Sequence, residues 1–88
     1  MFELVLLKPA LKFYKKSDKD LCRRLVKAFK KIEENPFVGK DIKKLRGKLS
    51  GFYRYKVNDV RIVYFVDKEK RKVNVVDIGY RGGIYQVD

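Results

Sequence analysis

The sequence of 88 residues contains no histidine, no tryptophan and a single cysteine, Cys22. Without histidine, neither a Cys–His nor a Ser–His nucleophile can form, and the usual zinc ligand sets are missing. A lone cysteine cannot form an internal disulfide bond, which fits a reducing cytoplasm, and we expect Cys22 to be partly buried. Acidic residues are scarce as well, with 11 against 23 basic ones, and they are scattered, with only Asp77 inside an expected strand of the second half of the chain. A two-metal carboxylate centre is therefore not expected, and the sequence predicts no metal ion and no other cofactor.

A long apolar run is also missing. The apolar stretch at residues 2–7 is too short for a signal peptide or a membrane span, and we expect an inner strand there. The glycines between Gly79 and Gly83 lack the spacing and the following helix of a phosphate-binding loop, so a tight turn is expected instead. These absences predict a soluble protein without a membrane partner.

Positive charge is what the sequence has in excess. The formal net charge is +12, and the basic residues are spread from Lys8 to Arg81. Hydrophobic residues make up 45% of the chain, which is enough for a folded core, and we expect one domain over residues 1–88. A charge of this size attracts polyanions. A nucleic acid or an acidic protein is therefore favoured over a generic solubilising surface, which would need a smaller imbalance.

Two helices are expected after the N-terminal strand. The first begins near Pro9, and the second begins with a capping pair, Ser17 and Asp20, and ends at Asn35-Pro36. Because the connection between them is short, we expect an antiparallel helical hairpin. The apolar side chains expected to face the core are Leu11, Phe13 and Tyr14 of the first helix and Leu21, Leu25, Ala28, Phe29 and Ile32 of the second.

The second half of the chain is expected to supply most of the sheet. Residues 36–51 are strongly basic and expected to be irregular, with Ile42 and Leu45 holding the segment against the core. A hairpin over residues 52–64 and a strand over Val73–Ile78 then form a three-stranded antiparallel meander. The order β-α-α-β-β-β predicts an α+β domain whose largely antiparallel sheet carries both helices on one face.

The hairpin carries the strongest functional signal. A two-residue turn at Asn58-Asp59 places Lys56 directly opposite Arg61, and side-chain alternation then puts Arg54 on the same face. Like charges placed opposite each other cost stability, so a fold alone would not need this cluster. A solvated basic strand face is the alternative interpretation. The cluster favours a polyanionic substrate.

Cationic and phenolic groups can cleave a phosphodiester of RNA without a metal ion. The reaction needs a base for the ribose 2′-hydroxyl, cations for the phosphorane and an acid for the leaving 5′-oxygen. Arginine pairs with two phosphate oxygens, and neighbouring cations make a lysine easier to deprotonate, so Lys56 is the candidate base. Among the tyrosines, Tyr80 and Tyr85 are candidates to stack on an unpaired base. Three others, Tyr53, Tyr55 and Tyr64, are expected on the opposite face of the hairpin, in the core.

The sequence resembles the RelE branch of the RelE/ParE toxin superfamily over essentially its whole length. The resemblance rests on the order and spacing of several short segments, which no single motif would establish alone. These segments are Lys44-Leu45-Arg46-Gly47, Tyr53-Arg54-Tyr55-Lys56, Arg61-Ile62-Val63-Tyr64, Ile78-Gly79-Tyr80-Arg81 and Ile84-Tyr85, preceded by the strand, the two helices and Asn35-Pro36.

The resemblance implies a small basic ribonuclease that cuts mRNA in the ribosomal A site, inhibits translation and is held inactive by an acidic RelB-type antitoxin. It places the catalytic basic residues at Arg54, Lys56, Arg61 and Arg81. It places a base-stacking tyrosine at Tyr85 and further RNA contacts at Arg46 and Lys44. Two departures stand out: position 54 is arginine where a familiar RelE has lysine, and the spacing from Arg81 to Tyr85 is short. Arg54 is therefore expected to stabilise phosphate rather than to transfer a proton.

Two alternatives remain open from the sequence. The same fold serves ParE-like proteins that bind DNA gyrase without cutting RNA, although the joint presence of Lys56, Arg61, Arg81 and Tyr85 argues against that function. The chain could also be a non-catalytic module that binds RNA or the ribosome. Simple RNA binding would follow salt concentration and would be insensitive to Lys56→Met, whereas a nuclease would lose cleavage.

Overall fold

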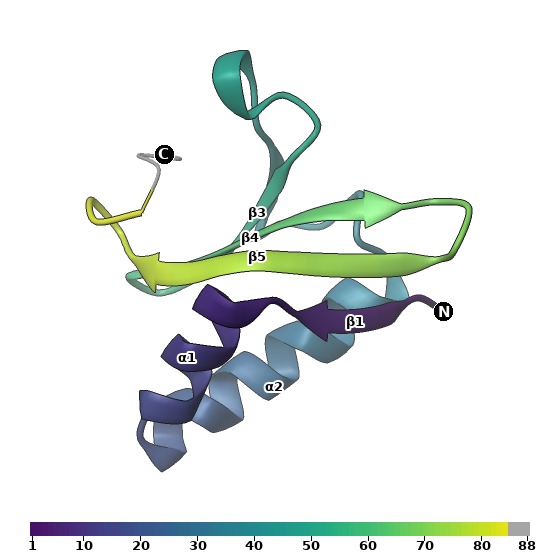
Figure 1. Cartoon of the computed structure of the whole chain (residues 1–88). Coiled ribbons are helices and arrows are strands. Elements are labelled where there is room, and N and C mark those ends of the chain that lie inside the picture. Colours follow the sequence, from purple (N-terminus) through teal and green to yellow (C-terminus); the bar gives the residue numbers. More distant parts are fainter. Residues whose placement is uncertain (85–88) are drawn as a thin grey trace.

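The computed structural model describes residues 1–84, which form a five-stranded sheet with two helices packed on one face (Figure 1). The sheet order is β1-β5-β4-β3-β2, with β1 parallel to β5 and all other neighbours antiparallel. This confirms the expected α+β fold of a strand, a helical hairpin and an antiparallel meander. The elements are β1 (Glu3–Leu6), α1 (Lys8–Lys16), α2 (Lys19–Glu34), β2 (Ile42–Lys44), a 3₁₀ helix (Gly47–Leu49), β3 (Tyr53–Val57), β4 (Val60–Asp67) and β5 (Lys72–Tyr80).

Helix α2 follows its predicted apolar pattern but not its predicted cap. Leu25, Ala28 and Ile32 are buried, and the helix ends before Asn35-Pro36 as expected. The N-cap is Asp18, whose carboxylate accepts a hydrogen bond from the Leu21 backbone N–H at 2.8 Å. The predicted Ser17–Asp20 capping pair is therefore wrong, because the helix begins one residue later than that pair requires.

Helix α1 lies across the sheet with a different inward residue than predicted. Ala10 is fully buried, whereas Leu11 is 36% exposed and does not face the core as expected. Phe13 and Tyr14 do pack against the core. A small residue at the centre of the contact lets α1 approach the sheet closely. Within residues 1–84, neither helix is both long enough and apolar enough to cross a membrane.

Strand β2 is a correction to the expected irregular segment at residues 36–51. It is short, and it adds to the edge of the sheet by pairing antiparallel with β3, with Ile42 opposite Tyr55. A 3₁₀ helix follows in the same segment and projects from the face of the sheet opposite the helices (Figure 1). Ile42 packs against the helix-side core and Leu45 is buried, as predicted.

Strand β5 contains a bulge that decides which side chains reach the core. Val75 pairs with Tyr64 and Asp77 pairs with Val63, so Val76 is one extra residue in the strand. An extra residue reverses the alternation of everything that follows it. As a result Ile78 is buried on the helix side, and Asp77 lies on the other face, which we call the open face.

Each face of the sheet has its own apolar cluster. The larger one lies under the helices and includes Ile62, Tyr64 and Val73. The smaller one is on the open face, where Leu45, Val63 and Ile84 are buried. The basic side chains of the hairpin are therefore built beside a packed surface, and the strands that carry them are held from both sides.

Candidate functional site

The β3–β4 hairpin has the predicted register. Val57 pairs with Val60 and Lys56 pairs with Arg61, joined by the Asn58-Asp59 turn, in which Asn58 has a left-handed φ of 52°. Asparagine tolerates this conformation better than most residues, which suits a tight turn. Lys56 and Arg61 therefore lie opposite each other on the open face, with Arg54 two residues away on the same face.

Two of these cations are fixed by main-chain carbonyl groups. Nη1 of Arg61 donates to the carbonyl of Asn58 at 2.6 Å and to that of Val60 at 3.3 Å, and the residue is only 3% exposed. Nη1 of Arg54 donates to the carbonyl of Asp41 at 2.7 Å. The same carbonyl accepts the backbone N–H of Lys56 at 2.9 Å. Both guanidinium groups are thus oriented before any ligand arrives, which reduces the entropy cost of binding.

Arg81 reaches the same place from the end of β5. Its backbone N–H donates to the carbonyl of Asp59 at 2.6 Å, which ties residue 81 to the hairpin turn. The next residue, Gly82, has a φ of 87°, which glycine adopts without strain and which lets the chain turn away. The side chain of Arg81 is exposed. The structure therefore brings Arg81 next to the turn that joins Lys56 to Arg61.

A pocket of about 580 Å³ lies beside this turn. Lys56, Arg61 and Arg81 line it from the hairpin side, and Lys40 lines it from the loop before β2. Its lining also includes Asp41 and Asp59, while Arg54 is not among the described lining residues. The structure thus gathers three of the four predicted catalytic residues around one pocket, with Arg54 beside it on the same strand as Lys56.

The other wall of the pocket is a part of the site that the sequence analysis missed. Arg24, Lys27 and Lys31 of α2 line it, with Ala28 between them. Their spacing places them on one side of the helix. On the sequence alone this face looks like any solvated basic helix face. The signal that distinguishes it is the position of α2 beside β3, which is a tertiary contact.

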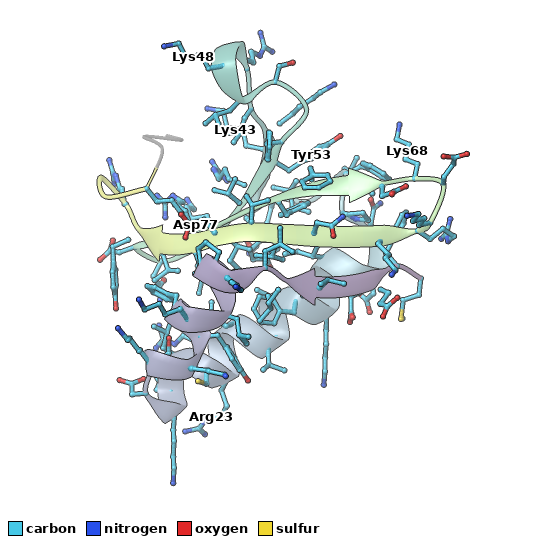
Figure 2. The ribbon with its side chains drawn as sticks, viewed as in Figure 1. Arg23, Lys43, Lys48, Tyr53, Lys68 and Asp77 are labelled. Carbon is cyan, nitrogen blue, oxygen red and sulfur yellow. The ribbon has the colours of Figure 1, made fainter. Side chains whose placement is uncertain are left out.

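Two of the predicted RNA-binding residues, Lys44 and Arg46, are not among the described residues that line the pocket. Lys44 pairs with Tyr53 at the edge of the sheet, so alternation places it on the helix side and not on the face of Arg54. Lys43 is the residue opposite Arg54, and Figure 2 shows it with Lys48 on the open side of the sheet, away from Arg23 of α2. Arg46 is exposed just before the 3₁₀ helix. Tyr85 lies outside the described residues.

Tyr53, Tyr55 and Tyr64 pack in the core on the helix side of the hairpin, as predicted. Tyr55 and Tyr64 are buried, and Tyr53 stacks on Tyr64 with 5.6 Å between ring centroids. The hydroxyl of Tyr64 donates to the carbonyl of Pro36 at 2.7 Å, and burial raises the pKa of Tyr64 well above that of a free phenol. Burial and, secondarily, the charge of Asp41 also raise the pKa of Tyr55. Tyr80, by contrast, is 57% exposed with its ring edge-on to Phe13.

Two helices on one face of a five-stranded mixed sheet form an α+β architecture that matches RelE-like toxin structures. The isolated Escherichia coli RelE toxin superposes with a TM-score of 0.78 at 29% identity, covering 97% of this chain and 92% of that one. The RelBE2 toxin–antitoxin complex of Mycobacterium tuberculosis gives 0.79 at 21% identity, with 91% and 98% covered. The archaeal RelE–RelB complex of Pyrococcus horikoshii gives 0.78 at 23% identity, with 93% and 97% covered.

The sequence itself settles the family. Residues 4–85 match the family described as the ParE toxin of type II toxin–antitoxin system, parDE. The chain therefore belongs to this family of the RelE/ParE superfamily and is a toxin of a type II toxin–antitoxin system, which confirms the resemblance seen in the sequence. Among curated protein sequences, none matches this chain.

Proposed function

We propose that this toxin is a metal-independent endoribonuclease that cuts mRNA in the ribosomal A site. The observation that carries the proposal is the convergence of Lys56, Arg61 and Arg81 on one pocket. One base, one cation for the phosphorane and one group for the leaving oxygen are needed for 2′-hydroxyl attack, and these three residues can supply them. Lys56 and Arg61 lie on strands β3 and β4, which the core holds in place. The relatives of known structure that resemble this chain include RelE toxins.

In the proposed reaction, Lys56 takes up the proton of the ribose 2′-hydroxyl, and the 2′-oxygen attacks the adjacent phosphorus. Arg61 and Arg54 stabilise the additional negative charge on the phosphorane through hydrogen bonds from their fixed guanidinium groups. Arg81 acts on the leaving 5′-oxygen, as acid or as an electrostatic substitute for one. The P–O5′ bond breaks, leaving a 2′,3′-cyclic phosphate and a 5′-hydroxyl.

Arginine is a poor proton donor because its guanidinium group holds its proton very tightly. We therefore expect weak cleavage of free RNA. Orientation of the mRNA by the ribosome supplies much of the remaining rate, since positioning can contribute many orders of magnitude. Tyr85 is proposed to stack on the base next to the cut, and Arg46 and Lys44 to contact the RNA outside the pocket.

The proposed inhibitor is an acidic RelB-type antitoxin. Several structural relatives are complexes with RelB or YefM antitoxins, as in the intact Escherichia coli RelBE complex. A net charge of +12 favours a partner segment that is negatively charged. Covering the pocket around Lys56 and Arg81 would block the site directly.

The test is cleavage of a defined mRNA on programmed ribosomes, with cut sites mapped by primer extension. We expect wild-type protein to cut at A-site codons, and both Lys56→Met and Arg81→Ala to reduce the rate at least 100-fold, the scale of lost acid–base catalysis. Lys12→Met, on the exposed surface of α1, is the control and should cut normally. Cleavage that persists in Arg81→Ala would contradict the role given to that residue.

A second candidate function is inhibition of DNA gyrase, as in ParE proteins, because the family match is to the ParE toxin of parDE. Intact mRNA with the wild-type protein, together with a block of gyrase supercoiling, would establish this function and exclude the first.

A further inference from the structure

One side of α2 faces the pocket with three basic residues. Arg24, Lys27 and Lys31 recur at a spacing of three and four residues, which aligns them along the helix. Ala28, which is 3% exposed, lies between them, and its small side chain leaves room in the pocket. These three side chains come from a different element than Lys56, Arg61 and Arg81, so the pocket has two cationic walls.

The charge in the pocket exceeds what one phosphate group requires. Its described lining holds seven basic and two acidic side chains. A single phosphodiester carries one negative charge and is satisfied by one or two arginine or lysine contacts. The volume of about 580 Å³ lies in the range of pockets that take a ligand larger than one phosphate. Both observations indicate a ligand with more than one phosphate.

We propose that Arg24, Lys27 and Lys31 form a second phosphate-binding subsite. It holds the phosphodiester of a neighbouring nucleotide of single-stranded RNA while the hairpin wall holds the reacting one. This inference rests on the proposed function, since it assigns the two walls to successive phosphates of the same RNA. The subsite positions the substrate and does not touch the reacting atoms.

An RNA strand fits this wall better than an acidic protein segment does. An amphipathic antitoxin segment gains most of its affinity by burying apolar surface. The apolar residues that line the pocket are Ala28, Tyr55 and Val57, and the first two are already buried, at 3% and 7% exposed. Little apolar surface is left to cover, whereas phosphate contacts need only the cations.

Asp20 offers a substitution that should strengthen RNA binding, whereas loss of the basic residues should weaken it. Its carboxylate forms an ion pair with Nη2 of Arg24 at 3.2 Å, one turn away on α2, and both side chains are more than half exposed. The carboxylate thus competes with an incoming phosphate for Arg24. Removing its charge should strengthen RNA binding, an effect that general damage to the fold cannot produce.

The experiment measures affinity for a short single-stranded RNA that carries a 2′-deoxy group at the scissile position, by fluorescence anisotropy over a range of salt. The pocket variant is R24Q/K27Q/K31Q. The matched control is K19Q/R23Q/K30Q, which removes the same charge from the solvent-exposed side of the same helix, outside the described pocket lining. Figure 2 shows Arg23 directed away from the sheet.

We expect the pocket variant to lose about tenfold in affinity at 0.1 M salt and to lower the salt slope by about 0.7, the value for one phosphate of a single strand. The control variant should change affinity by less than about threefold with its slope unchanged, because it removes only general attraction. D20N should bind about two- to threefold more tightly. Equal losses in the two triple variants would overturn the inference.

Two further outcomes separate this inference from the proposed function and from the protein-binding alternative. The binding assay needs no cleavage, so a wild-type protein that leaves mRNA intact while the pocket variant binds RNA poorly would refute the nuclease and keep the subsite. An oligo-glutamate peptide serves as the second probe. If the pocket variant loses the peptide but keeps the RNA, the wall is a protein-binding surface and the inference is wrong.

Discussion

The two faces of the β3–β4 hairpin use alternate residues of the same strands and have opposite properties. Toward the helices, Tyr55, Ile62 and Tyr64 are buried in an apolar core. On the open face, Lys56 and Arg61 contribute to the cationic pocket at the hairpin turn, and Arg54 lies beside them. Because the same two strands carry the core side chains and the basic side chains, packing of the core also positions the site. The comparison predicts that substitutions on one face change stability and substitutions on the other change function.

The largest expected effect is on the core face, at Ile62. Its side chain is fully buried, so Ile62→Ala should lower the free energy of unfolding by about 2–5 kcal/mol, and Ile62→Val by about 0.5–1.5 kcal/mol. Urea denaturation followed by circular dichroism measures both. Cleavage per folded molecule should stay within about threefold of wild type for Ile62→Val. A much larger loss of cleavage at unchanged folding would break the separation of the two faces.

A smaller effect is expected at Tyr64, and it depends on pH. Burial raises the pKa of Tyr64 in the folded state, so the folded protein keeps the proton at a pH where the unfolded chain releases it. The resulting stability is complete below a pH of about 10 and is lost as the pH rises above that value. Tyr64→Phe should cost about 1–2 kcal/mol at neutral pH, because the carbonyl of Pro36 loses its donor.

The check is the free energy of unfolding at several values between pH 8 and pH 11, for wild type and Tyr64→Phe. The difference between the two proteins should shrink as the pH rises. A constant difference over the whole range would show that the phenol does not ionise differentially on folding. All residues other than 64 are the same in both proteins, so their contributions cancel in the comparison.

The smallest effect is expected on the open face, at Lys56. Removing one of two like charges that lie directly opposite should raise the free energy of unfolding by about 0.2–1 kcal/mol in Lys56→Met. The same variant should lose cleavage, so stability and function move in opposite directions. Lys12→Met, which removes the same charge from α1, should change stability less. A Lys56→Met protein that is clearly destabilised would show that this lysine supports the fold.

The parts of this fold that follow local rules were predictable from the sequence. The hairpin register follows from the alternation of residues 53–64 and from the Asn58-Asp59 turn. The apolar side of α2 follows from its helical period. Strand β2 was missed because three residues, two of them lysine, carry no strand signal, and only pairing with β3 makes them a strand.

The site was only partly predictable for a similar reason. The bulge at Val76 puts Asp77 on the open face, and nothing in the local sequence fixes the position of a bulge. The burial of Arg61 depends on carbonyl groups of the turn, and the contribution of Arg24 and Lys31 depends on where α2 lies. The strand pattern identified the cations of the hairpin and the family resemblance added Arg81, but neither identified the cations of α2, which packing brings to the pocket.

The hydrogen bond from the Arg81 backbone N–H to the Asp59 carbonyl has one more consequence. It joins main chain to main chain, so the location of residue 81 does not depend on the side chain that the residue carries. Arg81→Lys would leave the cation in place and change only its shape, whereas proline, which has no N–H, would move it. The position of the cation at residue 81 and its chemical identity are therefore separate properties of this toxin. A substitution can alter either one without the other.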